Sequence, residues 1–385
     1  MVIWHTADGW LLPTVRVGQG WAVLRFVGGL AAPSFIFLAG AAVGLAARAG
    51  RTREQPVLVS ITRGLEIVLF GYALRFQTWL IDADAITQLH LARSFLPLGV
   101  GYALLFLSLR ALPTQPVRAG RYAVAGSLLV VAGLSQVPWL APGRLPRLLQ
   151  IDVLQAIGAS LVLLALGERS FRLLQRPGLA ILLGALVALL TEAVSSMLPG
   201  VLPVALAAYL GKFAPAAAGL PQPALFPLFP WLAYACIGAA FGTKLRTAGE
   251  HSDHYVVAAG LAGATLALCT SEAHQAVQSL MTAVPWSVHP LRVAFRVGLV
   301  LVLLLAGWLW AQGKRGRVLV SYGRASLRVY WAHLLIAYGS LGHPWQKQLQ
   351  MAEWATRLLL LLGLMWLLTR IGSAPTVPKR AEAST

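Results

Sequence analysis

Residues 22–53 read AVLRFVGGLAAPSFIFLAGAAVGLAARAGRTR, an apolar run that ends in three closely spaced arginines. From residue 22 to residue 47 the run contains a single charged residue, Arg25. It is longer than the roughly 20 residues that a helix needs to cross a bilayer. Arg48, Arg51 and Arg53 follow it directly, and basic residues beside a membrane helix favour the cytoplasmic side. The stretch predicts a membrane-spanning helix whose carboxyl end is cytoplasmic.

The rest of the chain repeats this pattern. Of its 385 residues, 58% are hydrophobic and only 11% are charged, whereas soluble domains contain about 25% charged residues. The apolar runs are continuous and lack the alternation of a transmembrane β-barrel. We therefore expect an all-α, polytopic membrane bundle of about ten to eleven transmembrane helices. The expected spans are residues 22–47, 56–76, 94–110, 122–140, 148–167, 178–198, 224–243, 254–281, 291–311, 318–340 and 353–371.

The basic residues alternate between the two sets of connections. The connections after residues 47, 110, 167, 243, 311 and 371 carry most of them, whereas the opposite connections carry Arg93, Arg144, Arg147, Lys212 and Lys347. This predicts that the first set lies in the cytoplasm and that the protein resides in the cytoplasmic (inner) membrane. Residues 1–372 then form the membrane domain, and residues 373–385 form a short cytoplasmic tail. The net charge of +18 becomes a topology signal, so no nucleic-acid partner is expected.

Two outer segments are too short to cross. Residues 1–12, MVIWHTADGWLL, look like the outer end of a helix. We expect a first helix to be incomplete, because translation starts upstream or because this form is truncated. The alternative is a short outward segment lying in the interface. Residues 199–223 form the longest outer connection and are expected to hold a short amphipathic or re-entrant helix near Leu202–Phe213.

Polar side chains inside the apolar runs are the candidates for function, because an ionised group at bilayer depth costs about 2.5–3.5 kcal/mol. The expected topology gathers most of them in the outer half: His5, Asp8, Arg25, Asp152, Gln155, Glu192, Glu272, His274, Gln275, Gln278, His289 and His333. Ser326, Tyr330 and His333 also share one helix face. We expect His333 and Asp152, with His5 or Arg25, to line one outward-opening cavity that contains a histidine–carboxylate hydrogen bond.

Structural explanations stay open beside the functional ones. They are an Arg63–Glu66 ion pair, an Asp152 ion pair with Arg147 or Arg25 that locks helices, a core histidine at position 333, and interfacial positions for Glu272 and His274. The sequence has no cysteine–histidine metal spacing, no P-loop and no G-x-S-x-G motif, so no metal is expected.

Four blocks in chain order are more specific than composition. They are APSFIFLAG (residues 32–40), LLQIDVLQAIG (148–158), FPLFPWLAY (226–234, followed by Gly238 and Gly242) and SLRVYWAH (326–333). Together they resemble the heparan-alpha-glucosaminide N-acetyltransferase-like family of polytopic membrane acyltransferases and its bacterial relatives. The family opens with a helix of which residues 1–8 resemble only the end, in agreement with an incomplete first helix.

The resemblance implies transfer of an acetyl or similar acyl group from acyl-CoA, the co-substrate, to a sugar-like or glycan acceptor on the outer side. Characterised members place an active histidine shortly before a tryptophan. The corresponding stretch here, residues 17–21, has none, and His5 is the nearest candidate. A histidine suits the role of base, oriented by a carboxylate, and in a ping-pong variant it carries the acyl group itself. The expected catalytic residues are His5, His333, Asp152 and Asp8, and the expected substrate-binding residues are Arg25, Gln155, Glu272, His274 and Tyr330.

Two other classes remain open. A transporter or flippase for a sugar, a lipid-linked glycan or an organic anion would also line its path with buried charges, although no inverted repeat is visible. A structural or assembly subunit would leave the outer polar residues unexplained. The expected partners are the lipid bilayer and a carbohydrate-like acceptor, and a homodimer is kept open.

Overall fold

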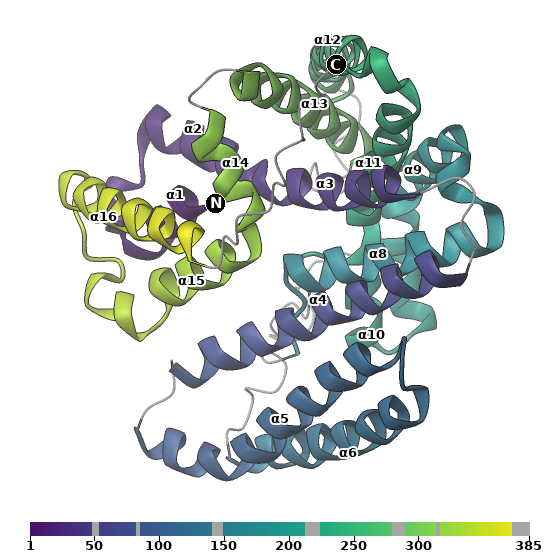
Figure 1. Cartoon of the computed structure of the whole chain (residues 1–385). Helices are drawn as coiled ribbons and strands as arrows, with labels where there is room; N and C mark the ends of the chain where they lie inside the picture. The colour runs from purple at the N-terminus through teal and green to yellow at the C-terminus, as the bar shows by residue number, and fades with distance from the viewer. Residues whose placement is uncertain are drawn as a thin grey trace, which may run out of the picture. The chain divides into compact units, whose positions relative to one another are not determined.

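The computed structural model describes residues 1–47, 54–81, 85–140, 149–211, 224–278, 289–312 and 316–371 (Figure 1). These residues form an all-α protein. Its α-helices are α1 Val2–Trp10, α2 Gly18–Gly29, α3 Ala31–Ala46, α4 Glu54–Ile81, α5 Ala85–Ala111, α6 Pro116–Leu140, α8 Val153–Phe171, α9 Pro177–Val201, α10 Val204–Leu210, α11 Leu228–Ala248, α12 Ser252–Gln278, α13 Pro290–Gln312, α14 Gly316–Arg324, α15 Ser326–Tyr338 and α16 Met351–Arg370. Short 3₁₀ helices lie at Pro13–Val15 (η1), Leu173–Gln175 (η2), Gly249–His251 (η4) and Ser340–Trp345 (η5).

Eight stretches of the described residues are long and apolar enough to cross a membrane, so the chain is a polytopic helical membrane protein. They are Gly18–Ala46, Val57–Gln77, Pro116–Gln136, Val153–Phe171, Pro177–Leu198, Leu228–Ala273, Pro290–Gln312 and Met351–Arg370. The stretch Leu228–Ala273 joins two expected spans, and a shorter apolar stretch, Leu96–Ala111, matches the expected span 94–110. The short helix expected near residues 202–213 is α10. The tail, residues 373–385, lies outside the described residues.

The expected span 318–340 is wrong as a single helix. The chain leaves the helical conformation at Ala325, whose φ and ψ are −97° and 13°, so that α14 and α15 are separate. A continuous helix would carry Arg324 into the interior of a span, where a charge is costly. The break instead puts Arg324 at the last residue of α14, where it is exposed.

The described chain forms two compact units, residues 29–306 and residues 1–28 with 307–385. We call the first the large unit and the second the small unit. In the large unit, α3 and α11 run parallel and in close contact. Gly40 and Gly44 of α3 face the main chain at Ala235 and Ala239, and Gly238 and Gly242 of α11 face Phe37 and Ala41. Such small-residue faces let membrane helices approach closely.

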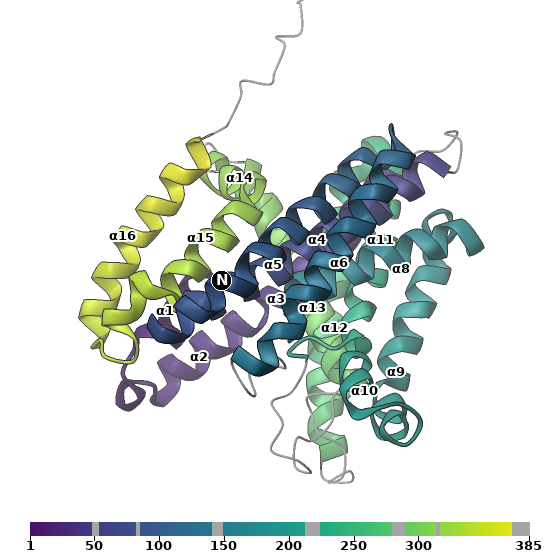
Figure 2. The ribbon, with the colours of Figure 1, turned by 90° about the horizontal axis from the view of Figure 1, so that it is seen from below.

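Three other pairs in the large unit are antiparallel. Glycines mark their contacts: Gly64 with Gly158 joins α4 to α8, Gly101 with Gly126 joins α5 to α6, and Gly263 with Gly298 joins α12 to α13. Figure 2 shows α5 and α6 side by side along their length. These directions, and the parallel α3–α11 pair, are the ones that alternating spans require. Which face is cytoplasmic stays a prediction.

In the small unit, α1 is fixed to the carboxyl-terminal helices α15 and α16. Trp10 is fully buried, and its indole N–H donates to the Ala337 carbonyl at 3.0 Å. Main-chain hydrogen bonds join Leu349 N–H to the Trp10 carbonyl and Leu12 N–H to the Leu349 carbonyl. The indole of Trp354 in α16 donates to the Thr6 hydroxyl at 3.2 Å. The first residues of the chain therefore share a core with its last helices.

Candidate active site

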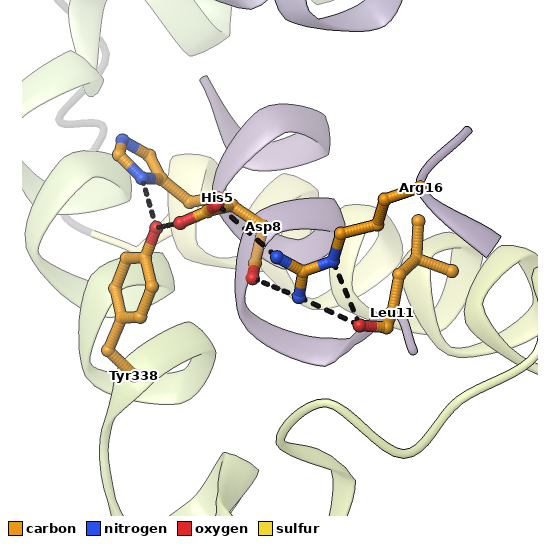
Figure 3. A network of polar contacts seen from close by, with 5 residues as sticks. All are labelled: His5, Asp8, Leu11, Arg16 and Tyr338. Atoms are coloured by element: carbon orange, nitrogen blue, oxygen red, sulfur yellow. Dashed lines mark hydrogen bonds and ion pairs between the residues drawn. The ribbon is translucent and has the colours of Figure 1, made fainter. Parts of the chain in front are cut away.

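A chain of side-chain hydrogen bonds joins α1 to α15 (Figure 3). His5 Nδ1 lies 3.0 Å from the Tyr338 hydroxyl, and this hydroxyl donates to Asp8 Oδ2 at 2.9 Å. Because the hydroxyl proton goes to the carboxylate, the Tyr338 oxygen accepts from His5 Nδ1–H. His5 Nε2 is then the nitrogen that carries the lone pair. His5 and Asp8 therefore do not form the direct histidine–carboxylate hydrogen bond that was expected: the Tyr338 hydroxyl lies between them.

Local packing explains why these side chains meet. His5 and Asp8 are three residues apart and lie on one face of α1. Gly9 lets this helix approach α15, since a Cβ on Gly9 would lie 2.8 Å from the Ala337 carbonyl oxygen. The close approach brings Tyr338 between His5 and Asp8.

Arg16 fixes the carboxyl end of α1. Its guanidinium donates to the Asp8 carbonyl at 2.6 Å and to the Leu11 carbonyl at 2.7 and 3.0 Å, so it satisfies carbonyls that a helix end leaves without partners. The same group lies 3.7 Å from Asp8 Oδ1. Arg16 therefore fixes the end of the helix that carries Asp8.

His333 presents a second lone-pair nitrogen. The side chain is 1% exposed, and its Nδ1 lies 2.6 Å from the Val329 carbonyl oxygen, one turn earlier in the same helix. A carbonyl accepts only, so Nδ1 carries the proton and Nε2 carries the lone pair. Nε2 is buried and has no hydrogen-bond partner in the part of the chain that the structure describes. It can act as a base, a nucleophile or an acceptor.

The two histidines form a pair. Their ring centroids are 5.4 Å apart, and the ring of Tyr330 stands edge-on to His333 at 5.7 Å. Helix α1, which carries His5, is too short to be a membrane span. Burial, with a smaller contribution from His333, lowers the pKa of His5 to about 3. Both the base and the nucleophile roles need this neutral imidazole.

Asp152 and Gln155 lie in the large unit, where they begin α8. Asp152 accepts from Val153 N–H at 2.8 Å, and Gln155 Oε1 accepts from Asp152 N–H at 3.0 Å, forming a capping box. The cap explains why α8 begins five residues later than the expected span. Asp152 also pairs with Arg75 of α4 at 3.2 Å, so neither Arg147, outside the described residues, nor Arg25 is the partner found.

The Arg63–Glu66 ion pair is confirmed at 3.0 Å. Glu66 also accepts from Arg110 Nε at 2.8 Å, so one buried carboxylate holds arginines from α4 and α5. This network neutralises itself in part and fixes two helices, which is a structural role.

The other residues expected in the site are Arg25, Glu272 and His274. Arg25 and Glu272 are exposed, and neither forms an ion pair within the described residues. The side chain of His274 lies outside the described residues. His5, Asp8, Arg25, Tyr330 and His333 belong to the small unit, and Asp152, Gln155 and Glu272 to the large one. The cavity expected to join His333 with Asp152 stays a prediction.

Sequence reasoning missed Tyr338, Arg16 and Arg75. Tyr338 lies off the helix face of Ser326, Tyr330 and His333, whose continuation is Ala337, so the periodicity of that face gave no signal for it. Arg16 and Arg75 carry no signal either, because their partners come from helix ends and from a neighbouring helix.

The family model described as heparan-alpha-glucosaminide N-acetyltransferase, catalytic, matches residues 1–277. Comparison with curated proteins and with solved structures gives no match. The matched residues include His5 and Asp8 and end before α13. They make up more than half of the chain, and the protein belongs to the heparan-alpha-glucosaminide N-acetyltransferase catalytic family.

Proposed function

We propose that this chain is a membrane acyltransferase. It moves an acetyl or similar acyl group from acyl-CoA to a hydroxyl or amine of a sugar-like acceptor, on the outer side of the membrane. Family membership supports acetyl transfer and the donor. The His5–His333 pair supports the chemistry, and it is the observation that carries the proposal.

His5 is the base in this proposal. Its Nε2 takes the proton of the acceptor O–H or N–H while the acceptor atom bonds to the thioester carbonyl carbon. The carbon–sulfur bond breaks, and the leaving thiolate takes the proton back from the imidazolium. Tyr338, whose hydroxyl is bonded to Asp8, holds the ring in the tautomer that carries its proton on Nδ1.

His333 supplies the second imidazole. Its buried Nε2 accepts the hydrogen bond that orients the acceptor. In the ping-pong form of the reaction, one of the two Nε2 atoms attacks the thioester and carries the acyl group before the acceptor takes it. Arg25 and Tyr330 bind substrate in this proposal.

The decisive experiment is incubation of the purified protein in detergent with acetyl-CoA labelled in the acetyl group. We expect release of free CoA thiol that depends on an added amino sugar, with label on the sugar. Label on the protein before acceptor is added indicates the ping-pong form. If no thiol is released with any amino sugar, and reconstituted vesicles instead take up a sugar or an organic anion, the transporter alternative is correct.

Tyr338→Phe tests the link between His5 and Asp8. It removes one hydroxyl and keeps the ring, so we expect kcat to fall about tenfold, the order expected for one charge-assisted hydrogen bond. Tyr322→Phe is the matched control. Tyr322 donates to the Leu362 carbonyl at 2.7 Å in the same unit, and its loss should cost about 1 kcal/mol of stability without changing kcat. Equal kcat for Tyr338→Phe and wild type would separate Asp8 from the reaction.

A further inference from the structure

Two arginines lie close together near the amino end of α13. Arg292 and Arg296 are one helical turn apart, in the large unit, and both are partly exposed. Neither forms an ion pair with a carboxylate of the described residues.

Tyr234 of α11 completes the cluster. It is 2% exposed, and its side chain lies close enough to Arg296 to interact with the guanidinium. Arg292 is close enough to the same hydroxyl to interact with it electrostatically. On another side, Arg296 Nη2 lies 3.7 Å from the position of a Cβ on Gly29, so its guanidinium fits beside a residue without a side chain. Two guanidiniums and one phenol therefore meet from two helices.

The charges of this cluster are not balanced within the described residues. Like charges at i and i+4 repel each other, and the amino end of a helix adds further positive potential. Glu272, on the neighbouring helix α12, is exposed and makes no ion pair with either arginine. An arrangement of this kind is stabilised by an anion.

We propose that Arg292, Arg296 and Tyr234 bind a phosphate monoester. Two guanidiniums match the two negative charges of such a group, whereas a carboxylate would leave one arginine uncompensated. Guanidinium donors pair with phosphate oxygens in bidentate fashion. Since arginine has no acceptor, the hydrogen of the Tyr234 hydroxyl is not donated to either guanidinium and can go to a third phosphate oxygen.

Two sources carry this chemistry. One is the 3′-phosphate of CoA, and this identification rests on the proposed acyl transfer. The other is a sugar phosphate, and it does not depend on that activity. Binding without turnover tests both, so that failure of the site and failure of the transferase proposal give different results.

The experiment measures dissociation constants for the full-length protein in detergent, by tryptophan fluorescence. The probes are CoA against 3′-dephospho-CoA, and glucosamine 6-phosphate against glucosamine. We expect one phosphorylated probe of these pairs to bind at least tenfold more tightly than its partner. The preference should disappear in Arg292→Ala/Arg296→Ala and should return in part in Arg292→Lys/Arg296→Lys, which retains both charges.

Arg118→Ala/Arg121→Ala is the matched control. It also removes two positive charges from the large unit, at exposed positions in the first two turns of α6, and should keep the full preference. A preference in the CoA pair assigns the site to the donor, and a preference in the sugar pair assigns it to a phosphorylated acceptor. Absence of a preference in both pairs, or a preference that survives Arg292→Ala/Arg296→Ala, overturns the proposal. The Lys variant also shows whether loss of binding in the Ala variant is only misfolding.

Discussion

His333→Ala is expected to lower kcat/KM for acyl transfer by about 10²- to 10⁴-fold, the range for loss of a positioned proton-transfer group. Nδ1 of His333 is hydrogen-bonded to the Val329 carbonyl. Nε2 is buried without a hydrogen-bond partner among the described residues, and the ring lies beside that of His5. His333→Gln should be as inactive, because an amide can still donate to Val329 but offers no basic nitrogen. The measurement is the initial rate of CoA thiol release at several acceptor concentrations.

The controls separate chemistry from folding. His343 is an exposed histidine in the same unit, and His343→Ala should keep the wild-type rate. His5→Ala/His333→Ala should be little worse than the poorer single variant, since residues that act as a unit are not additive. If His333→Ala retains more than a tenth of the activity, His333 is a core histidine and the site must be placed around His5 alone.

Gly40→Ala/Gly238→Ala should give a large loss of stability. A Cβ at either glycine overlaps the main chain of the opposite helix, at Ala235 and at Phe37 respectively. Main chain cannot turn away as a side chain can, so α3 and α11 must separate. Overpacking typically costs about 1–3 kcal/mol per site, and the apparent Tm in detergent should fall accordingly.

Gly307→Ala is the matched control for this packing. Nothing lies within 4 Å of a Cβ at Gly307 in α13, and alanine is the better helix former by about 1 kcal/mol. This variant should be as stable as wild type or slightly more stable. If Gly40→Ala/Gly238→Ala melts at the wild-type temperature, the close parallel contact between α3 and α11 is not present in the folded protein.

The spans were predictable because each depends on a continuous apolar run and its basic ends. Two helix boundaries that were predicted wrongly, at Ala325 and at the start of α8, depend on local features of the chain. The break at Ala325 has no glycine or proline at the residue itself, and the start of α8 depends on a side chain, Asp152, that reads equally well as a buried catalytic group. A capping residue and a catalytic carboxylate have the same identity in the sequence.

Of the candidate site, composition and spacing identified the histidines and Asp8 as polar residues in an apolar setting. They predicted that His333 would lie near His5 or Arg25, but they did not predict that Tyr338 would contact His5 and Asp8. His5 contacts Tyr338 across 333 positions of sequence, and no periodicity within one helix encodes a contact of that kind. The tautomers of His5 and His333 likewise depend on partners that only the folded chain brings close.

The hydrogen bonds between α1 and the carboxyl-terminal helices have a consequence for synthesis in the cell. At 5–20 residues per second, Tyr338 is translated roughly 17–67 s after His5. During that interval Trp10 lacks its acceptor at Ala337 and the main-chain partner that Leu349 provides. A chain that stops after the family-matched portion, residues 1–277, lacks α15, so that neither His333 nor Tyr338 is present beside His5. Under the proposed mechanism, acyl transfer would therefore begin only after α15 has been synthesised and packed against α1.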